Sequence, residues 1–461
     1  MSAISCFKAY DLRGRIPSEL NEEVAYRVGR AYAAFLSPAR LVVGRDIRLS
    51  SPGLAEALTR GLTEGGADVD DIGVCGTEGV YFATFDGGYD GGIMVTASHN
   101  PPDYNGMKFV REQSRPISAD NGLKEIRALA EREELRPGAK RGVRRAVDTA
   151  GRYLGHLLSY VNVEKLRPLK IVVNAGNGAA GPVLDLLEPH LPFELVKIHH
   201  QPDGRFPNGV PNPMLEENRI PTAQAIRAHG ADLGLAWDGD FDRCFFFDER
   251  GDFIEGYYIV GLLASALLRA AGAGAAGTRI VHDPRLTWNT QEIVRACGGQ
   301  TVLSKSGHAF IKQRMREVDA LYGGEMSAHH YFRRFAYCDS GMIPWLLIAQ
   351  LLSESGKPMS GLVGERIARF PVSGELNYRV PDAASAMAAV ESRYARGACS
   401  IERTDGLSFE FADWRFNLRS SNTEPLIRLN VEARGSADLM RSRTHELLGV
   451  LASQGAVAAD H

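Results

Sequence analysis

The chain has 461 residues, and at about 150 residues per domain this length predicts roughly three domains, with two or four as alternatives. Its 53 Lys and Arg against 56 Asp and Glu give a formal net charge of −3. Because binders that attach to nucleic acid or membranes by charge alone are usually more basic, we expect neither partner. Hydrophobic residues make up 44% and charged residues 24% of the chain, which argues against global disorder.

Two further absences narrow the class of protein. The first ten residues lack the continuous apolar segment of a signal peptide, and no stretch approaches 18 uninterrupted apolar residues. The six cysteines are scattered without a C-x-x-C pair, so neither a zinc site nor a disulfide framework is indicated. We therefore predict a cytoplasmic protein of enzyme size whose cysteines are buried free thiols.

The predicted elements alternate between short apolar runs and helix-period segments up to about residue 355. This alternation is typical of βαβ units with mixed or parallel sheets, and it occurs three times. The predicted strands are 41–46, 92–98, 169–174, 233–237, 279–283 and 321–325, and the predicted helices are 51–65 and 288–296. Each unit ends a buried strand in a polar loop, and in open α/β sheets ligands bind beyond the carboxyl ends of strands.

The last part of the chain follows a different pattern, which predicts a smaller α+β domain. An alanine-rich helix is followed by two strands joined by Asp405-Gly406, which is a hairpin signal. In order, the predicted elements are the helix 383–394, the strands 399–403, 407–411, 414–418 and 426–431, and a final helix 438–451. Charged or polar connections are predicted at 131–145, 248–256 and 353–360, and the Gly- and Ala-rich segment 272–277 is predicted to be a loop that ends a helix.

The first polar loop reads Thr-Ala-Ser-His-Asn-Pro over residues 96–101. Ser98 at a strand end can act as a nucleophile if a neighbour takes its proton and cations neutralise the incoming group. A serine hydrolase is disfavoured because G-x-S-x-G is absent, and in an extended segment His99 would point away from Ser98. A plain turn explains the Ser, Asn and Pro content equally well.

The second polar loop carries Asp238, Asp240 and Asp242 directly after a buried strand. If this segment is nearly extended, its period of two puts all three carboxylates on one side. Mg²⁺ is the natural cation for an oxygen-only set that also serves phosphate. An EF-hand fits poorly, since Arg243 stands where that loop needs Gly, and the alternative is a solvated acidic turn.

The third and fourth loops add polar groups that suit a phosphorylated sugar. Residues 323–330, Gly-Gly-Glu-Met-Ser-Ala-His-His, can bind hydroxyls and exchange protons, although the two histidines are equally consistent with surface residues. Residues 419–425, Arg-Ser-Ser-Asn-Thr-Glu-Pro, with Arg428 beyond them, suit a phosphate dianion better than a bare capping turn does. Together the four loops predict phosphoryl transfer on a phosphorylated polyol.

With these motifs in order from Lys8-Ala-Tyr-Asp-Leu-Arg-Gly14 to the Arg419 loop, the whole chain resembles the α-D-phosphohexomutase family, in its bacterial phosphomannomutase/phosphoglucomutase branch. The resemblance implies three related α/β domains with mixed sheets and a smaller α+β C-terminal domain around a central cleft. The expected domains are 1–145 with the serine loop, 146–254 with the metal loop, 255–367 with the sugar-recognition loop and 368–461 with the phosphate loop.

The resemblance also implies roles for individual residues. Ser98 matches the serine that is phosphorylated, and it completes the Mg²⁺ site of Asp238, Asp240 and Asp242. Arg285 stands where related mutases often carry Lys, and the spacing from Glu325 favours His329 over His330 as the ring in the cleft. The other residues expected to contact substrate are Tyr10, Arg13, Lys108, Arg243, His308, Glu325, Ser327, His329, Arg419, Ser421, Asn422, Thr423 and Arg428.

The mechanism expected from this resemblance passes a phosphoryl group from Ser98 to mannose 6-phosphate or mannose 1-phosphate. A hexose 1,6-bisphosphate is the intermediate and activator, and Lys108 and His329 are the candidates for proton transfer. Phosphoglucomutase and phosphoglucosamine mutase are the alternative enzymes. A metal-dependent sugar phosphatase and a silent sugar-phosphate binding protein are the alternatives of other classes. Small hexose phosphates are the expected partners, and the chain is expected to be a monomer or a weak homodimer.

Overall fold

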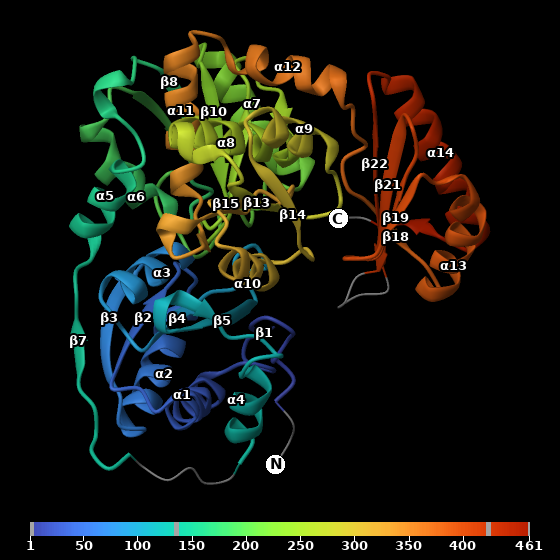
Figure 1. Cartoon of the computed structure of the whole chain (residues 1–461). Coiled ribbons are helices and arrows are strands. Elements are labelled where there is room, and N and C mark those ends of the chain that lie inside the picture. The colour runs from blue at the N-terminus through green and yellow to red at the C-terminus, as the bar shows by residue number, and fades with distance from the viewer. Residues whose placement is uncertain (1–3, 133–137, 421–425, 460–461) are drawn as a thin grey trace. The chain divides into compact units, whose positions relative to one another are not determined.

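The computed structural model describes residues 4–132, 138–420 and 426–459 (Figure 1). The chain forms two compact units, of which the first comprises Met1–Phe253 and His329–Gly356 and the second comprises Ile254–Ala328 and Lys357–His461. Hydrophobic cores lie within each unit. None of the helices in the described ranges is long and apolar enough to cross a membrane.

Among its described residues, the first unit contains two sheets, the antiparallel strand pair β16 and β17, and eight helices. Its strands are β1 (Leu12–Arg15), β2 (Arg40–Arg45), β3 (Asp68–Val74), β4 (Gly91–Val95), β5 (Tyr104–Arg111), β6 (Arg115–Pro116), β7 (Arg144–Ala146), β8 (Lys170–Asn174), β9 (Glu194–Ile198), β10 (Leu233–Trp237), β11 (Cys244–Phe247), β16 (His330–Phe332) and β17 (Cys338–Asp339). Its helices are α1 (Glu22–Leu36), α2 (Ser51–Glu64), α3 (Thr77–Asp86), α4 (Leu123–Ala130), α5 (Ala150–Leu158), α6 (Ala180–Leu187), α7 (Glu216–His229) and α11 (Met342–Ser355).

The first sheet is buried on both faces, as its continuous apolar strands predict. Its order is β1-β5-β4-β2-β3-β7, with β6 paired to β5, and β5 is antiparallel to both of its neighbours. Leu41 and Val43 of β2 pack against α1 and α2, whereas Val42 packs on the other face against α3 (Figure 1). This arrangement brings the ends of β2 and β4, and the loops that follow them, to one edge of the sheet.

The second sheet of this unit is also mixed. Strands β12 (Phe253–Ile254), β11, β10, β8 and β9 lie in that order, with β8 parallel to β9 and β10, and β10 antiparallel to β11. The strands β16 and β17 form a short antiparallel hairpin just before α11. The predicted strands 169–174 and 233–237 are confirmed as β8 and β10.

The second unit contains the remaining α/β elements and the C-terminal sheet. Its strands are β13 (Arg279–His282), β14 (Gln300–Leu303), β15 (Tyr322–Gly324), β18 (Leu376–Arg379), β19 (Ser400–Glu402), β20 (Leu407–Glu410), β21 (Trp414–Ser420), β22 (Leu426–Ala433) and β23 (Val457–Ala458). Its helices are α8 (Gly256–Ala271), α9 (Trp288–Ala296), α10 (His308–Val318), α12 (Met359–Arg369), α13 (Ala383–Tyr394) and α14 (Ala437–Ser453).

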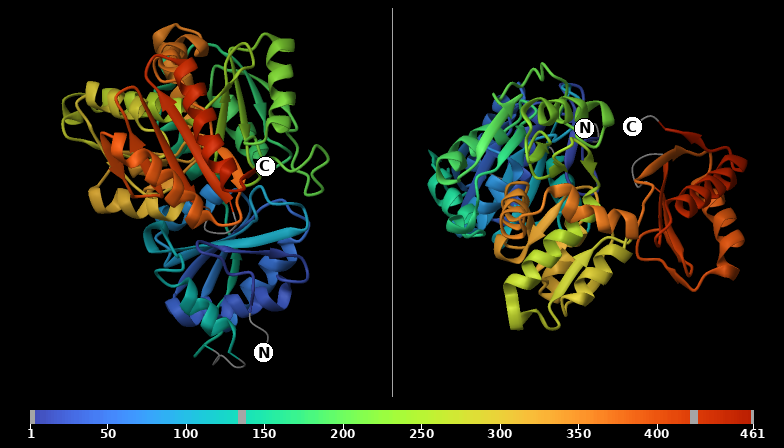
Figure 2. Two further views of the ribbon diagram at one scale, coloured as in Figure 1. Left: turned by 90° about the vertical axis from the view of Figure 1, so that its right-hand side faces the viewer. Right: turned by 90° about the horizontal axis from the view of Figure 1, so that it is seen from above.

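The C-terminal sheet confirms the predicted α+β domain. Its order is β19-β20-β21-β22-β18-β23, and α13 and α14 cover one face of it (Figure 2). The core between the sheet and these helices includes Val390, Phe416 and Leu447. The Asp405-Gly406 hairpin joins antiparallel strands β19 and β20, as predicted.

Three sequence-based predictions need correction. The linker 131–145 ends in β7, which pairs in parallel with β3 because Arg144 and Arg145 bind acidic side chains of that strand. The connection 353–360 instead holds the end of α11 and the beginning of α12. All six cysteines are free as predicted, but Cys75 and Cys297 are only half-buried, and Cys399, which lies beside the edge strand β19, is exposed.

Glu78 is a fully buried carboxyl group in the first turn of α3. It accepts hydrogen bonds from the backbone N–H of Gly341 at 2.5 Å and of Met342 at 3.2 Å, and from the hydroxyl of Tyr153. These contacts tie α3 to the start of α11. Burial nevertheless outweighs the hydrogen bonds and raises the pKa of Glu78 to about 8.

The raised pKa of Glu78 predicts a pH-dependent contribution to stability. Between about pH 4.5 and 8 the folded state retains a proton that the unfolded state has lost, so this group lowers stability as pH rises, by up to roughly 4 kcal/mol. We expect the stability of wild type relative to Glu78→Gln to fall as pH is raised from 5 to 8, measured by thermal unfolding. Glu125→Gln, at an exposed position on α4, is the control and should show no such trend. A constant difference would contradict the prediction.

Candidate active site

The loop after β4 presents Ser98 to the acidic loop after β10. Ser98 has a φ of 51°, and this left-handed turn takes the chain out of the extended conformation. The hydroxyl of Ser98 donates to Asp238 Oδ2 at 2.8 Å, and its oxygen lies 3.0 Å from Nδ1 of His99. The prediction that His99 points away from Ser98 is therefore wrong, because it assumed an extended segment.

Two arginines hold the serine loop through its backbone carbonyls. Arg48, from the loop after β2, is 1% exposed and donates to the carbonyls of Ser98 at 2.9 Å, Asn100 at 2.6 Å, Pro101 at 2.7 Å and Tyr104 at 2.9 Å. Arg13 on β1 donates to the carbonyl of Ala97 at 3.3 Å and to the Asn100 side chain. These contacts fix the backbone of the loop that carries Ser98.

The acidic loop is a six-residue turn between the antiparallel strands β10 and β11, whose ends Trp237 and Cys244 are paired. A φ of 43° at Phe241 folds the loop back. The carboxylates of Asp238, Asp240 and Asp242 converge, with oxygens within 4.8 Å of one another. The predicted clustering is present, but a turn and not an extended segment produces it. The three side chains are buried, so the alternative of a solvated acidic turn is wrong.

Gly239 allows the two loops to touch. A Cβ atom at this position would lie 2.5 Å from the carbonyl oxygen of Ser98, closer than a carbon atom can approach. No other residue type fits there without moving one loop. The contact between the serine loop and the acidic loop therefore depends on the absence of a side chain at position 239.

Cations surround the acidic cluster. Lys108 on β5 donates to Asp240 Oδ2 at 2.8 Å and to Asp242 Oδ2 at 2.5 Å, and Arg243 donates to Asp238 Oδ2 at 2.8 Å. Burial alone would raise the pKa of Asp240, but Lys108 offsets it and the pKa is lowered. Burial and the negative charge of Asp240 raise the pKa of Asp242 to about 6. The cluster thus holds more negative charge than one ammonium and one guanidinium fully neutralise.

The carboxylates retain atoms that fit a divalent cation. Asp240 Oδ1 and Asp242 Oδ1 are buried and accept no hydrogen bond from any residue that the structure describes. Buried polar atoms are normally paired, and an all-oxygen donor set is what Mg²⁺ prefers. The Asp238, Asp240 and Asp242 cluster therefore fits Mg²⁺ in its chemistry.

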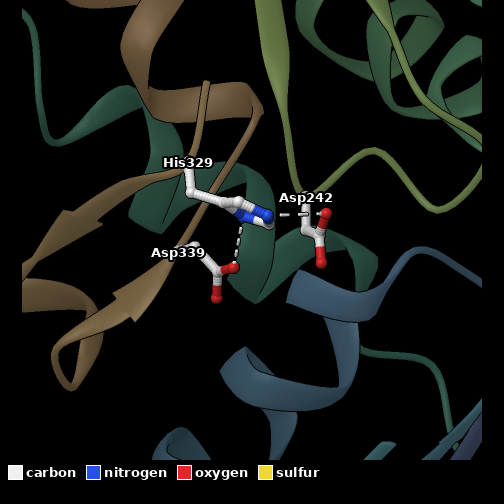
Figure 3. A group of neighbouring side chains, drawn as sticks. All are labelled: Asp242, His329 and Asp339. Atoms are coloured by element: carbon white, nitrogen blue, oxygen red, sulfur yellow. Dashed lines mark ion pairs between the residues drawn. The ribbon is translucent and has the colours of Figure 1, made fainter. Parts of the chain in front are cut away.

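His329 belongs to the same group of side chains. Its Nδ1 lies 2.8 Å from Asp339 Oδ2 and 4.0 Å from Asp242 Oδ1, so the ring points toward both carboxylates (Figure 3). The backbone of His329 also bridges to that of Arg243. His330 is fully buried on β16, and burial lowers its pKa to about 3. Neither histidine is a surface residue, which corrects that alternative, and His329 is the ring beside the acidic loop.

In the second unit, Arg285 organises the loop that is predicted to recognise the sugar. It is 3% exposed and donates to Asp283 through two nitrogens, at 3.0 and 2.9 Å, and to Ser327 Oγ at 3.3 Å. The Gly307 N–H, next to His308, donates to Glu325 Oε1 at 2.7 Å. The predicted residues Arg285, His308, Glu325 and Ser327 are thus linked by direct or neighbouring contacts.

The two arginines predicted to bind phosphate also lie together in the second unit. Arg419 and Arg428 are directly opposite each other on β21 and β22. Glu375, just before β18, lies 3.2 Å from Arg419, 3.4 Å from Arg428 and 3.1 Å from Arg285. The predicted residues Ser421, Asn422 and Thr423 fall outside the described residues, and Tyr10 is half-buried before β1.

Comparison with known protein families shows that four segments of this chain match the four domains of one family. Residues 5–137, 151–251 and 255–370 match domains I, II and III of phosphoglucomutase/phosphomannomutase, each described as alpha/beta/alpha, and residues 375–449 match its C-terminal domain. The chain belongs to the phosphoglucomutase/phosphomannomutase family. The resemblance to α-D-phosphohexomutases and the predicted fold class of three α/β domains and a C-terminal α+β domain are confirmed.

Individual members of this family are similar over their whole length. A phosphomannomutase of Salmonella montevideo is 59% identical over 460 residues, covering 98% of this chain and all of that protein. A protein named phosphohexose mutases from Xanthomonas campestris pv. campestris is 59% identical over 448 residues, covering 97% of this chain and 99% of that protein. The crystal structure of a phosphoglucomutase/phosphomannomutase family protein from Burkholderia thailandensis has a TM-score of 0.88 at 32% identity, covering 100% of this chain and 99% of that one.

Four residues of this family member were not predicted from its sequence. Arg48 and Thr77 contact the serine and acidic loops, with Thr77 Oγ1 donating to Asp240 Oδ2 at 2.5 Å. Asp339 holds His329, and Glu375 holds the arginines. Each of these residues contacts a partner that is distant in the sequence, from 10 positions away for Asp339 and His329 to 163 positions away for Thr77 and Asp240. The available signal was a charged residue directly after an apolar strand, as in Arg45-Asp46-Ile47-Arg48.

Proposed function

We propose that this chain is a phosphomannomutase that interconverts mannose 6-phosphate and mannose 1-phosphate, with phosphorylated Ser98 and a hexose 1,6-bisphosphate as intermediates. The observation that carries the proposal is the 2.8 Å hydrogen bond from Ser98 to Asp238, because it joins a nucleophile to a buried cluster of three carboxylates. The name of the Salmonella montevideo relative supports mannose phosphates as substrates.

The reaction exchanges one phosphoryl group between serine and sugar. The P–O bond to Ser98 Oγ breaks while a P–O bond to the free sugar hydroxyl forms, and the hydroxyl proton passes to His329. The bisphosphate then reorients. Its other phosphoryl group returns to Ser98, and the proton returns to the sugar oxygen left behind. Substrate and product are isomers, and the enzyme regains its phosphoserine.

The roles of the surrounding residues follow from their contacts. Asp339 Oδ2 lies 2.8 Å from Nδ1 of His329, which supports His329 as the group that exchanges the proton, since a carboxylate beside the ring stabilises its protonated form. Lys108 donates to two carboxylates, and their charges raise its pKa despite burial. This supports a role for Lys108 as a fixed cation beside the transferring group, in place of the proton transfer expected from the sequence.

Asp238, Asp240 and Asp242 would hold Mg²⁺, with an oxygen of the Ser98 phosphate as a further ligand. Bound Mg²⁺ supplies neutralisation of the charge on the transferring phosphoryl group. Arg13 and Arg243 add fixed positive charge beside Ser98. Glu325, Ser327, His308 and Arg285 bind the sugar, and Arg419 and Arg428, with the predicted Ser421, Asn422 and Thr423, bind the phosphate that is not transferred.

The proposal is tested by combining activity with the phosphorylation state of the purified protein. We expect isomerisation of mannose 1-phosphate, activated by the 1,6-bisphosphate, and an intact mass that includes one phosphate located on Ser98. Release of inorganic phosphate in most turnovers would indicate a sugar phosphatase, and ligand binding without phosphoserine would indicate a silent binding protein. A higher kcat/KM on glucose 1-phosphate or glucosamine 1-phosphate would favour the phosphoglucomutase or phosphoglucosamine mutase alternatives.

Removal of divalent cations is expected to lower mutase turnover by at least roughly 100-fold, because the charge on the transferring group is then no longer neutralised. Dialysis against a chelator followed by addition of Mg²⁺ measures this effect and its reversal. Asp240→Asn should raise the Mg²⁺ concentration needed for half-maximal activity. Asp232→Asn, which changes an acidic residue before β10 outside the loop, is the matched control. Full activity in chelator would overturn the metal assignment.

A further inference from the structure

Glu375 lies where a bound phosphate would be expected to find only positive charge. Its carboxylate contacts Arg285, Arg419 and Arg428 at 3.1, 3.2 and 3.4 Å. Its side chain is 11% exposed, against 13% for Arg419 and 30% for Arg428. The Arg428 side chain is therefore the one most open to solvent, while Glu375 and Arg419 are enclosed to a similar degree.

The sheet itself creates the need for this carboxylate. Arg419 and Arg428 are a direct cross-strand pair on β21 and β22, and like charges directly opposite each other destabilise a sheet. Glu375 immediately precedes β18, in which Asn377 pairs with Arg428. The register of three strands thus brings one anion to the pair of cations, which holds the two side chains together.

The charges of these side chains determine how much net positive charge is available to a bound phosphate. Arg285 is already bound to Asp283 through two nitrogens. Two guanidinium groups and one carboxylate are then left, with a net charge of +1, beside a more distant Asp405 at 3.9 Å from Arg419. Arg419 Nε is buried and donates to no residue that the structure describes. A phosphate dianion would find a donor and a net positive charge, but less charge than two arginines alone provide.

We infer that Glu375 sets the phosphate affinity of this site, by preorganising Arg419 and Arg428 while weakening their hold on the phosphate so that it can leave. This inference rests on the proposed function, in which the bisphosphate must dissociate from the phosphate-binding arginines before it can reorient. A site of two arginines without the carboxylate would bind more tightly and release more slowly. Glu375 is a positioning residue, since it acts through the arginines.

The test uses a substitution that removes the negative charge of Glu375 but keeps the size and shape of its side chain. We expect Glu375→Gln to bind inorganic phosphate roughly ten-fold more tightly by calorimetry, with a gain that shrinks at high salt. In the mutase assay, KM for mannose 1-phosphate should fall and kcat should fall with it, because release is slower. Glu391→Gln removes a charge from the same domain at the Arg403 pair on its surface, and it should leave all three values unchanged.

A purely structural role would give a different result. If Glu375 only stabilises the sheet, Glu375→Gln should bind phosphate equally or more weakly, and that outcome overturns the inference. Should this variant fail to fold, Glu375→Asp retains the charge but withdraws it from the arginines, and it should bind phosphate more tightly than wild type. Unchanged or weaker binding by Glu375→Asp would be equally decisive against the inference. Because calorimetry with inorganic phosphate does not depend on turnover, failure of the mutase proposal would be recognised separately, by missing isomerisation and missing phosphoserine.

Discussion

Replacing Ser98 with alanine is expected to reduce mutase turnover by at least roughly 1,000-fold, because the phosphoryl group then has no oxygen to pass through. The same variant should lose the added phosphate from its intact mass. The fold should persist, since the substitution removes the contacts of one hydroxyl group, the hydrogen bond to Asp238 and the 3.0 Å contact with His99, which together contribute about 1–2 kcal/mol. Thermal unfolding and steady-state kinetics on one preparation check both expectations.

The control for this experiment is another serine of the same domain. Ser18 is exposed in a turn after β1, and Ser18→Ala should retain both turnover and phosphate. Near wild-type turnover by Ser98→Ala would refute the role of Ser98, whatever the state of the acidic loop. Retained phosphate in Ser98→Ala would locate the phosphorylated residue elsewhere.

The sequence was sufficient to predict those loops whose functional residues lie close together along the chain. Ser98 and the Asp238, Asp240 and Asp242 set each lie within a few residues after an apolar strand, and strand ends could be predicted from hydrophobic runs. Their convergence required more than periodicity, because left-handed residues at Ser98 and Phe241 bend both loops. An assumption of extended backbone therefore placed the carboxylates correctly for the wrong reason and misplaced His99.

The residues that support these loops could not be predicted in the same way. Arg48 lies 50 positions before Ser98, Thr77 lies 163 before Asp240, and Glu375 lies 44 before Arg419. Only the three-dimensional pairing of strands brings each to its partner. A buried arginine is also rare enough that composition gives no reason to expect it inside the protein. Long-range support of this kind becomes visible only when the fold is known.

Replacing Arg48 with methionine is expected to give the largest loss of stability, combined with a loss of activity. The substitution fills a similar volume but leaves the carbonyls of the serine loop buried without their donors, a cost of about 3–5 kcal/mol. Since the loop then no longer holds Ser98 against Asp238, kcat should fall by roughly 100-fold or more. Arg48→Lys retains the charge but cannot bridge four carbonyls from one ammonium, so it should be intermediate in both respects.

The pattern across the variants separates a support for the serine loop from a general effect of removing an arginine. Arg60→Met changes an exposed arginine on α2, whose guanidinium lies over the Tyr26 ring, and should cost less than about 1 kcal/mol with unchanged kcat. The ring of Phe206 lies 5.1 Å from the Arg48 guanidinium, so Arg48 also joins the serine loop to the segment after β9. If Arg48→Met kept wild-type kcat after a large loss of stability, Arg48 would stabilise the fold without positioning Ser98. The order wild type, Arg48→Lys, Arg48→Met in kcat is what positioning requires, because each step removes donors from the carbonyls that fix the nucleophile.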